Sequence, residues 1–465
     1  MVSLVEVNCG YQSKNLTVKS FELANLNLHQ LQQANLKKTP FLLESVVQAT
    51  GLTNISRYSI LFAYPQKETV LDDAVNSAEF IDSFNQDFLA QKPDSSYSNI
   101  DLPFKGGWFC YFSYDYAEVV EPVLQLHKST TPLAIISRIP CAFVVDHEKD
   151  LIHLIAEKQF DFKLAEMRSM LENQLNPTKI ESIQPLNIMS ETQEEVESKY
   201  LDGIAEIKEY ILSGDIFQVN LSREWQLEVS DLTSTDIYAS LRKHNPAPFA
   251  ANVVFKNFAI ISSSPERLVK YASQTGWVET RPIAGTRERS DCLVADQSLV
   301  KELISHPKEI AEHIMLIDLE RNDLGRICQP GSVEVNELMS VETYQHVHHI
   351  VSNVRGKLAE QHKKSPLDII HAVFPGGTIT GCPKIRCMEI IAELEQMPRE
   401  AYTGSVGYFN LDGSLDTNIL IRTFMLKNNK LSFRAGAGIV ADSIANKELA
   451  EAKQKAKGLI NALQV

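Results

Sequence analysis

Two pairs of glutamates, each three residues apart, are the side chains in this sequence with the clearest chemical use. Glu309 and Glu312 leave one side of a helix expected over residues 305–326, and Glu448 and Glu451 repeat the arrangement near the end of the chain. The apolar stripe of the first helix consists of Ile310, Ile314 and Ile317. Four carboxylates on two facing helices would repel unless they were protonated or bridged by a cation, and Mg2+ takes one or two carboxylates together with substrate oxygens. Taken alone, each pair is also typical of a solvated helix face.

Three glycine-containing bends offer backbone N–H groups that could hold a carboxylate. The bend at residues 374–384, FPGGTITGCPK, has two glycines spaced as in a phosphate loop, but it continues as Cys-Pro-Lys, which excludes a nucleotide site. The bends at residues 281–287, RPIAGTR, and 434–438, RAGAG, are commonly tight turns when either stands alone.

Histidine and arginine side chains could supply protons and positive charge. His346, His348 and His349 suggest zinc, but no cysteine or further histidine follows at a useful spacing. A single inward-facing histidine acting as a general acid is the better functional interpretation. Arg422 lies at the end of an apolar strand, where an unpaired guanidinium would be costly, so it should meet a carboxylate of the protein or of a ligand.

Composition narrows the class of protein. The 465 residues are 44% hydrophobic, enough for a large core, and the net charge of -14 argues against a nucleic-acid partner. Any anionic substrate must therefore be bound by local cationic groups or a metal. Seven scattered cysteines, no recognisable signal peptide and no apolar run long enough to cross a membrane lead us to expect a reduced, cytoplasmic protein.

Strand-like segments flanked by helical ones predict an α+β architecture. Segments rich in Val, Ile, Phe and Tyr fall at residues 57–65, 106–118, 139–146 and 151–157. Residues 176–195 have the composition of a linker. We therefore expect one unit over residues 1–185 and a second unit, which carries both glutamate pairs, over residues 186–465.

Longer motifs connect the chain to a known family. IAEHIMLIDLERNDLGR, YQHVHHIVSNVRG, FPGGTITGCPKIRCMEIIAELE, GSVGYFNLDGSLDTNILIRT and GAGIVADS follow one another in this order. In sequence and spacing they resemble the chorismate-utilising enzymes, especially the large subunits of aminodeoxychorismate synthase and anthranilate synthase. The resemblance covers residues 196–460 and, more loosely, residues 40–150. It implies antiparallel sheets packed as a large sandwich with flanking helices, and a binding site for chorismate, which carries two carboxylates.

The resemblance also implies a role for each glutamate. Glu312 and Glu451 match the family's Mg2+ ligands, and Glu309 and Glu448 match residues that support the metal directly or through water. The metal would hold the ring carboxylate of chorismate. His349 matches a catalytic histidine beside the ring, which is suited to protonating the departing 4-hydroxyl.

Further residues match contacts to the two carboxylates of chorismate. Those on the side of the ring carboxylate are Gly285, Thr286 and Lys455. Those on the side of the enolpyruvyl carboxylate are Tyr408, Arg422, Gly436 and Gly438. Thr378 lies at the matching position of the glycine-rich bend and is counted with the catalytic residues.

Two positions concern the nucleophile. Relatives that form isochorismate carry a lysine that activates water where this chain has Gln218, so the resemblance implies ammonia. Aminodeoxychorismate synthases commonly carry a lysine at position 284. This chain has Ala284 instead, and an alanine at this position resembles the anthranilate synthases. Residues 218–221, QVNL, and 404–407, GSVG, resemble aminodeoxychorismate synthase more closely.

Three functions follow for consideration. The leading one is amination of chorismate at C4, giving 4-amino-4-deoxychorismate for p-aminobenzoate and folate biosynthesis. The alternative is amination at C2 with loss of pyruvate, giving anthranilate for tryptophan biosynthesis. A non-catalytic tryptophan-binding regulatory module is the third. The chain shows no glutaminase signature, so a separate glutamine amidotransferase subunit is implied as the source of ammonia.

Two short segments resemble the tryptophan pocket of the family. A buried strand start and a proline turn explain the same residues nearly as well. The residues concerned are Leu43, Glu44, Ser45, Asn245, Pro246 and Phe249.

Overall fold

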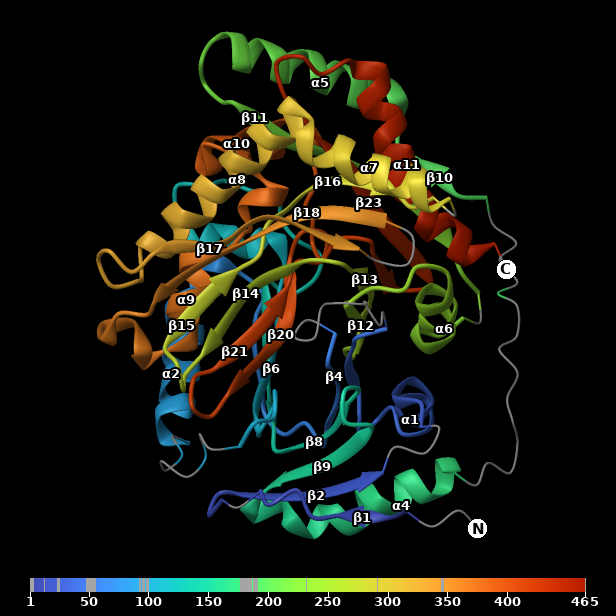
Figure 1. Ribbon diagram of the computed structural model, residues 1–465, viewed down its shortest axis with the longest axis vertical. Coiled ribbons are helices and arrows are strands. Elements are labelled where there is room, and N and C mark those ends of the chain that lie inside the picture. Colours follow the sequence, from blue (N-terminus) through green and yellow to red (C-terminus); the bar gives the residue numbers. More distant parts are fainter. Residues whose placement is uncertain are drawn as a thin grey trace.

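The protein forms two antiparallel sheets that pack face to face, with helices on their outer faces (Figure 1). The computed structural model describes residues 4–11, 13–22, 26–46, 56–91, 93, 97, 100–175, 186, 191–230, 232–290, 292–343 and 347–464. The expected α+β sandwich is therefore confirmed. In the described ranges, no helix combines the length and the apolar character needed to cross a membrane.

The first sheet has 13 strands in the described part of the chain. In spatial order they are β1 (Glu6–Val7), β2 (Leu16–Glu22), β9 (Leu151–Glu157), β8 (Cys141–Asp146), β4 (Tyr58–Ala63), β3 (Phe41–Glu44), β12 (Phe249–Val254), β13 (Ala259–Ser264), β22 (Thr423–Lys427), β23 (Lys430–Ile439), β11 (Gln218–Glu228) and β10 (Gln193–Glu194), with β19 (Gly381–Cys382) also paired to β11.

The second sheet has ten strands among the same residues. Their order is β16 (Ile283–Glu288), β18 (Val347–Lys357), β15 (Trp277–Thr280), β14 (Arg267–Ala272), β21 (Leu415–Asn418), β20 (Ser405–Asn410), β6 (Gly107–Phe112), β7 (Ala134–Ile139) and β5 (Glu68–Leu71), with β17 (Glu334–Thr343) paired to β18. The strands expected from the Val-, Ile-, Phe- and Tyr-rich segments correspond to β4, β6, β8 and β9.

Both sheets contain strands from both expected units. β3 pairs with β12, and β6 pairs with β20, so strands more than 200 positions apart in the chain are neighbours in space. The expected linker, residues 176–195, lies largely outside the described residues. The two halves of the sequence therefore build each sheet together.

Three apolar clusters hold these layers. One fills the space between the sheets and includes Phe41, Phe62, Phe109 and Tyr408. The second packs the outer face of the first sheet against α1 (Leu28–Ala34), α4 (Leu164–Leu175), α6 (Ser234–His244) and α11 (Ala445–Leu463). The third involves α2 (Ser77–Ala90), α5 (Glu197–Leu212), α8 (Pro307–Gly325), α9 (Pro366–Val373) and α10 (Lys384–Glu395).

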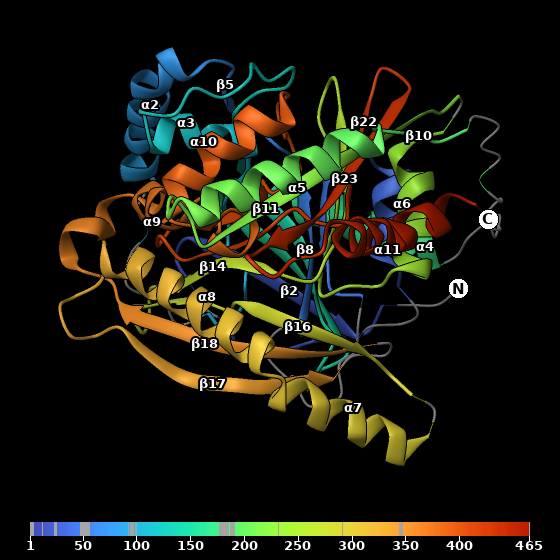
Figure 2. The same ribbon diagram turned by 90° about the horizontal axis from the view of Figure 1, so that it is seen from above.

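The two glutamate-bearing helices, α8 and α11, lie at the same end of the molecule (Figure 1). Seen from above, α5 and α11 lie over β11 and β23, while α8 lies beside β16 and β18 (Figure 2). Pro307 at the first position of α8 suits a helix start, because its missing N–H would have no partner there. Of the stripe expected on α8, Ile317 is buried but Ile314 is 48% exposed, because the helix packs through Leu316 and Leu319 instead.

Candidate active site

The paired strands β11 and β23 bring the first predicted site residues together. Asn220 of β11 lies opposite Gly438 of β23. A Cβ at Gly438 would lie only 2.2 Å from Nε2 of Gln218, so the amide of Gln218 occupies the space beside this glycine. Nε2 of Gln218 donates a hydrogen bond of 3.1 Å to Oε1 of Glu312 on α8. A predicted substrate contact and a predicted metal ligand thus lie on either side of Gln218.

Most of the segment expected as a bend, residues 281–287, belongs to strand β16 in the structure. This strand lies against the start of α8. Gly285 has φ +64°, and a Cβ there would lie 2.8 Å from Oε2 of Glu309. Nη1 of Arg287 lies 3.2 Å from Oε1 of Glu309. Across the sheet, Thr286 lies opposite His349. The structure therefore gathers Gly285, Glu309 and His349 in one region.

Helix α11 meets the other side of the paired strands. Nζ of Lys455 lies 2.9 Å from Oε1 of Glu451 and donates a hydrogen bond of 3.1 Å to the backbone oxygen of Gly436 on β23. Glu448, one turn earlier on the same helix, is buried. The second pair of glutamates is thus fixed over β23, the neighbour of the strand that carries Gln218.

Among the described residues, the predicted glutamates do not form a closed metal site, so the assignment of Mg2+ stays a prediction. Over the described ranges, no three His, Cys, Asp or Glu side chains lie close enough together to hold an ion by themselves. Mg2+ needs only one or two carboxylates, because water and substrate oxygens complete its shell. His348 does not support the zinc alternative, because its ring nitrogens contact Thr343 and Asp296. His346 lies outside the described residues.

A buried acid that the sequence analysis missed lies between these elements. Glu266 lies between β13 and β14, and its Oε1 accepts a hydrogen bond of 2.8 Å from Oγ1 of Thr378. Burial raises the pKa of Glu266 to about 7, against the opposing effects of Thr378, Arg422 and Lys455. The carboxyl is therefore close to half protonated at neutral pH. The available signal was a charged residue close to the end of a predicted strand, here Glu266 after the segment AIISSSP, as for Arg422.

Arg422 lies beside this acid without forming a close ion pair to it. Burial lowers the pKa of the Arg422 guanidinium, and the negative charge of Glu266 opposes that effect. Among the described residues, no carboxylate lies within 4.0 Å of the guanidinium. Of the two partners expected from the sequence, a ligand carboxylate is the one that the structure leaves available.

His349 is buried on β18, and its environment favours the neutral ring. Burial lowers the pKa of His349 to about 4, and the positive charge of Arg422 acts in the same direction. The ring interacts with the backbone of Gly285, which opposes the shift. Glu266, whose carboxyl keeps its proton to higher pH, is a second candidate for the acid role that the resemblance assigns to His349.

The glycine-rich bend at residues 374–384 is held from two sides. Besides the contact of Thr378 with Glu266, Nδ2 of Asn220 donates a hydrogen bond of 3.1 Å to the backbone oxygen of Thr378. Asn220 was not singled out in the sequence, although it lies two residues after Gln218. The bend therefore connects the strand that carries Gln218 with the buried acid.

Tyr408 is the predicted substrate contact that the structure does not bring to this cluster. Its ring packs between the sheets on Phe62 and Phe104, with centroid distances of 6.1 and 5.7 Å. It lines a cavity of about 590 Å3. A side chain on β20 that points into the sandwich faces away from α8 and α11, which explains the separation.

The same cavity contains part of the predicted tryptophan pocket. Leu43, Glu44 and Phe249 line it, whereas Ser45, Asn245 and Pro246 do not. Glu44 is already bound inside the protein, since Arg242 and Tyr238 contact its carboxylate at 2.7 and 2.9 Å. A ligand in this cavity would therefore meet a carboxylate that is largely neutralised.

Comparison with known proteins identifies the family of this chain. Residues 40–461 match the family described as chorismate binding enzymes. An anthranilate synthase component I-like protein of Synechocystis sp. is 43% identical over 78% of this chain and 74% of its own length. Aminodeoxychorismate synthase component 1 of Bacillus subtilis is 42% identical over 79% of both chains. Anthranilate synthase component I from Streptococcus pneumoniae has the same fold, with a TM-score of 0.76, 32% identity and coverage of 87% of this chain and 92% of its own.

The family match and the fold together indicate an enzyme that acts on chorismate. The chain belongs to the chorismate binding enzyme family.

Proposed function

We propose that this protein catalyses the Mg2+-dependent amination of chorismate at C4 with ammonia, and that the product, 4-amino-4-deoxychorismate, leads to p-aminobenzoate and folate. The observation that carries the proposal is the arrangement of Glu266, Thr378 and Arg422. It combines a proton donor with a pKa close to neutrality and a guanidinium that no protein carboxylate contacts closely.

These groups match the needs of the reaction. The enolpyruvyl carboxylate of chorismate would pair with Arg422, since burying either charge alone is costly. The 4-hydroxyl leaves as water after it receives a proton from Glu266. The nitrogen that has added to the ring then loses a proton, which restores the protonated carboxyl, so that chorismate and ammonia give the aminated product and water.

A metal would serve the opposite end of the substrate. Glu312 and Glu451 would hold Mg2+, with Glu309 and Glu448 in support. When bound, the ion supplies positive charge for the ring carboxylate, which an acidic protein otherwise repels. Lys455, fixed between Glu451 and the Gly436 carbonyl, adds a further positive charge on this side.

Gln218 favours ammonia as the nucleophile. Its amide donates to Glu312, and an amide cannot take a proton from water as a lysine amine can. We therefore include a glutamine amidotransferase subunit in the proposal as the partner that supplies ammonia.

A second candidate function is the formation of anthranilate and pyruvate. Ala284 favours it, because aminodeoxychorismate synthases commonly carry a lysine at that position. Several similar proteins are also described as anthranilate synthase component 1, for example one from Acetivibrio thermocellus that is 36% identical over 91% of this chain.

The products of a single reaction separate these functions. The protein is incubated with chorismate, Mg2+ and an ammonium salt, and the products are identified by chromatography and fluorescence. A product that yields p-aminobenzoate only after a lyase is added supports C4 amination. Fluorescent anthranilate together with pyruvate contradicts C4 amination and supports the second candidate. Tryptophan binding without any consumption of chorismate contradicts both and supports a regulatory module.

A further inference from the structure

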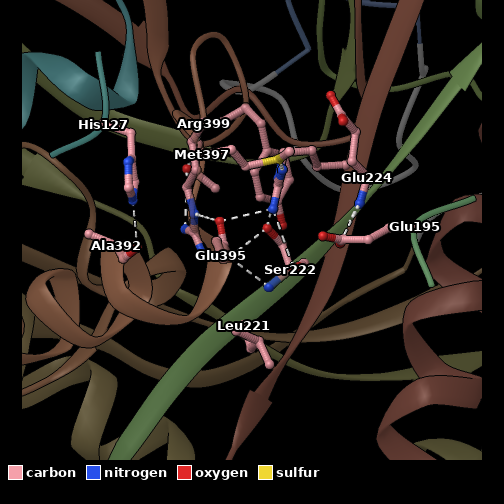
Figure 3. Close-up of polar contacts among 12 residues, drawn as sticks. His127, Glu195, Leu221, Ser222, Glu224, Ala392, Glu395, Met397 and Arg399 are labelled. Carbon is pink, nitrogen blue, oxygen red and sulfur yellow. Dashed lines mark hydrogen bonds and ion pairs between the residues drawn. The ribbon is translucent and has the colours of Figure 1, made fainter. Parts of the chain in front are cut away.

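A buried ion-pair cluster joins Glu395 to Arg399 and Arg434, and Figure 3 shows Glu395 and Arg399 near Ser222 and Met397. The carboxylate of Glu395, at the end of α10, contacts two guanidinium groups. Arg399 approaches it at 2.6 Å and Arg434 at 3.0 Å. Burial alone would raise the pKa of Glu395, but the charges of Arg399 and Arg434 lower it to about 2, so this carboxylate stays ionised.

Arg399 uses all five of its N–H donors. Nε and one N–H of Nη2 bind Glu395, and the second N–H of Nη2 donates to the backbone oxygen of Asn220 at 2.7 Å. Nη1 donates to the backbone oxygen of Ile379 at 3.2 Å and contacts Oγ1 of Thr403 at 3.5 Å. The side chain is only 1% exposed, so each donor that lost its partner would be left without water.

The two carbonyls that Arg399 binds belong to the two segments that meet at the candidate active site. Ile379 follows Thr378, whose hydroxyl contacts Glu266, and Asn220 lies two residues after Gln218, which contacts Glu312. A single rigid guanidinium thus fixes the distance between the acid side and the metal side of the site. A lysine could keep the positive charge but could not reproduce the planar set of donors.

We propose that Arg399 is a positioning residue for the chorismate reaction. It holds the bend at residues 374–384 against β11 so that the hydroxyl of Thr378 meets Glu266. The proposal rests on the proposed function, because it assigns Arg399 to the geometry of that same site.

Arg434 provides a matched control. It binds the same carboxylate and is equally buried, but its other contacts are Ser222 and Met397, and none of them lies in the bend. If the cluster only stabilises the fold, Arg399→Lys and Arg434→Lys should have the same consequences. If Arg399 positions the bend, only Arg399→Lys should affect catalysis beyond the loss of folded protein.

The experiment compares the two variants with the wild-type protein in steady-state consumption of chorismate with Mg2+ and ammonium, alongside thermal unfolding. We expect similar decreases in Tm for both variants. In Arg399→Lys, kcat should fall about a hundredfold, as expected when a reacting group is misplaced by about 1 Å, while KM for chorismate stays within about threefold. In Arg434→Lys, kcat per folded molecule should stay within about threefold of the wild-type value. Equal losses of kcat in both variants would overturn the proposal.

The pH profile gives a second readout that a purely structural role would not change. The hydrogen bond from Thr378 lowers the pKa of Glu266, and the other charged groups facing that carboxyl are Arg422, Lys455 and Glu320. Loss of the Thr378 contact in Arg399→Lys should therefore move the basic limb of kcat/KM to higher pH. An unchanged basic limb, together with an unchanged kcat, would contradict the inference.

A further variant covers the case in which Arg399→Lys does not fold. Replacing the whole cluster with apolar residues (Glu395→Leu, Arg399→Met and Arg434→Met) leaves no lone buried charge, a change that proteins commonly tolerate. This variant still lacks the donors to Ile379 and Asn220, so its kcat should fall to a similar extent, and wild-type kcat would overturn the proposal. A wild-type protein that does not consume chorismate would instead contradict the proposed function.

Discussion

Glu266 and two of the glutamates predicted to serve the metal, Glu309 and Glu451, have opposite surroundings. Glu266 is 6% exposed, touches one hydroxyl and has no close cationic partner among the described residues. Glu309 of α8 and Glu451 of α11 lie nearer to solvent and next to cations: Arg287 lies 3.2 Å from Glu309, and Lys455 lies 2.9 Å from Glu451.

This difference separates two chemical tasks. A carboxyl taken out of water without a counter-ion keeps its proton to higher pH, and Glu266 has a pKa of about 7 for this reason. A carboxylate beside cations stays charged and can attract a metal ion or hold a lysine in place. One type of side chain can thus serve as proton donor in one place and as metal ligand in the other.

The largest effect is expected from removing the proton of Glu266. Glu266→Gln keeps the shape of the side chain and an acceptor for Thr378, but it cannot transfer a proton. We expect kcat to fall about 10^2- to 10^4-fold, the usual contribution of a positioned acid, as measured by chorismate consumption at saturating Mg2+. Circular dichroism checks that the fold is retained. Activity within a few-fold of the wild-type value would show that Glu266 is not the acid.

Loss of a predicted metal ligand should come next. Glu312→Ala or Glu451→Ala removes one of the carboxylates proposed for Mg2+, and we expect kcat/KM to fall about a hundredfold or more, with partial recovery as Mg2+ is raised. Asp318→Ala is the control, since this exposed carboxylate of α8 pairs only with Arg321 in the described structure. Near-normal activity in both glutamate variants would contradict the assignment to the metal.

The pH dependence of stability tests the burial of Glu266. Its pKa rises from 4.5 to about 7 on folding, so its contribution to stability is fully present below about pH 4.5 and is lost as the pH rises through about 7. Glu266→Gln removes this dependence. Between about pH 5 and pH 8, the unfolding free energy of the wild type should therefore fall relative to that of the variant, by at most about 3 kcal/mol. Parallel pH curves from chemical denaturation would contradict the burial.

The smallest effect is expected at Tyr408. Because its ring lies between the sheets, away from α8 and α11, Tyr408→Phe should leave kcat/KM within about threefold of the wild-type value, equivalent to less than about 0.7 kcal/mol. A large increase in KM for chorismate would instead support the prediction from the sequence that Tyr408 contacts the substrate.

Local patterns predicted much of this protein. The spacing of the glutamates and of their apolar neighbours gave α8 and α11, and the Val-, Ile-, Phe- and Tyr-rich segments gave β4, β6, β8 and β9. The motifs gave the family, which the comparisons confirm. Helical and strand periodicities are properties of neighbouring residues, so they can be read along the chain.

Predictions failed where the answer depends on distant residues. Ile314 has the spacing of a buried residue, but the neighbours of α8 leave it 48% exposed. Tyr408 stands in a motif with Arg422 but lies on β20 of the second sheet and faces the space between the sheets, whereas Arg422 precedes β22 of the first sheet. Glu266 and Arg399 looked ordinary in the sequence, because Glu266 meets Thr378 and Arg399 meets Asn220, each more than a hundred positions away.

The sequence by itself determined the family, the main helices and strands, and which side chains could carry charge. Only the tertiary structure decided which carboxyl is stripped of water and which stays beside a cation. That choice depends on burial and on partners from remote parts of the chain, and both arise only when the two sheets close on each other.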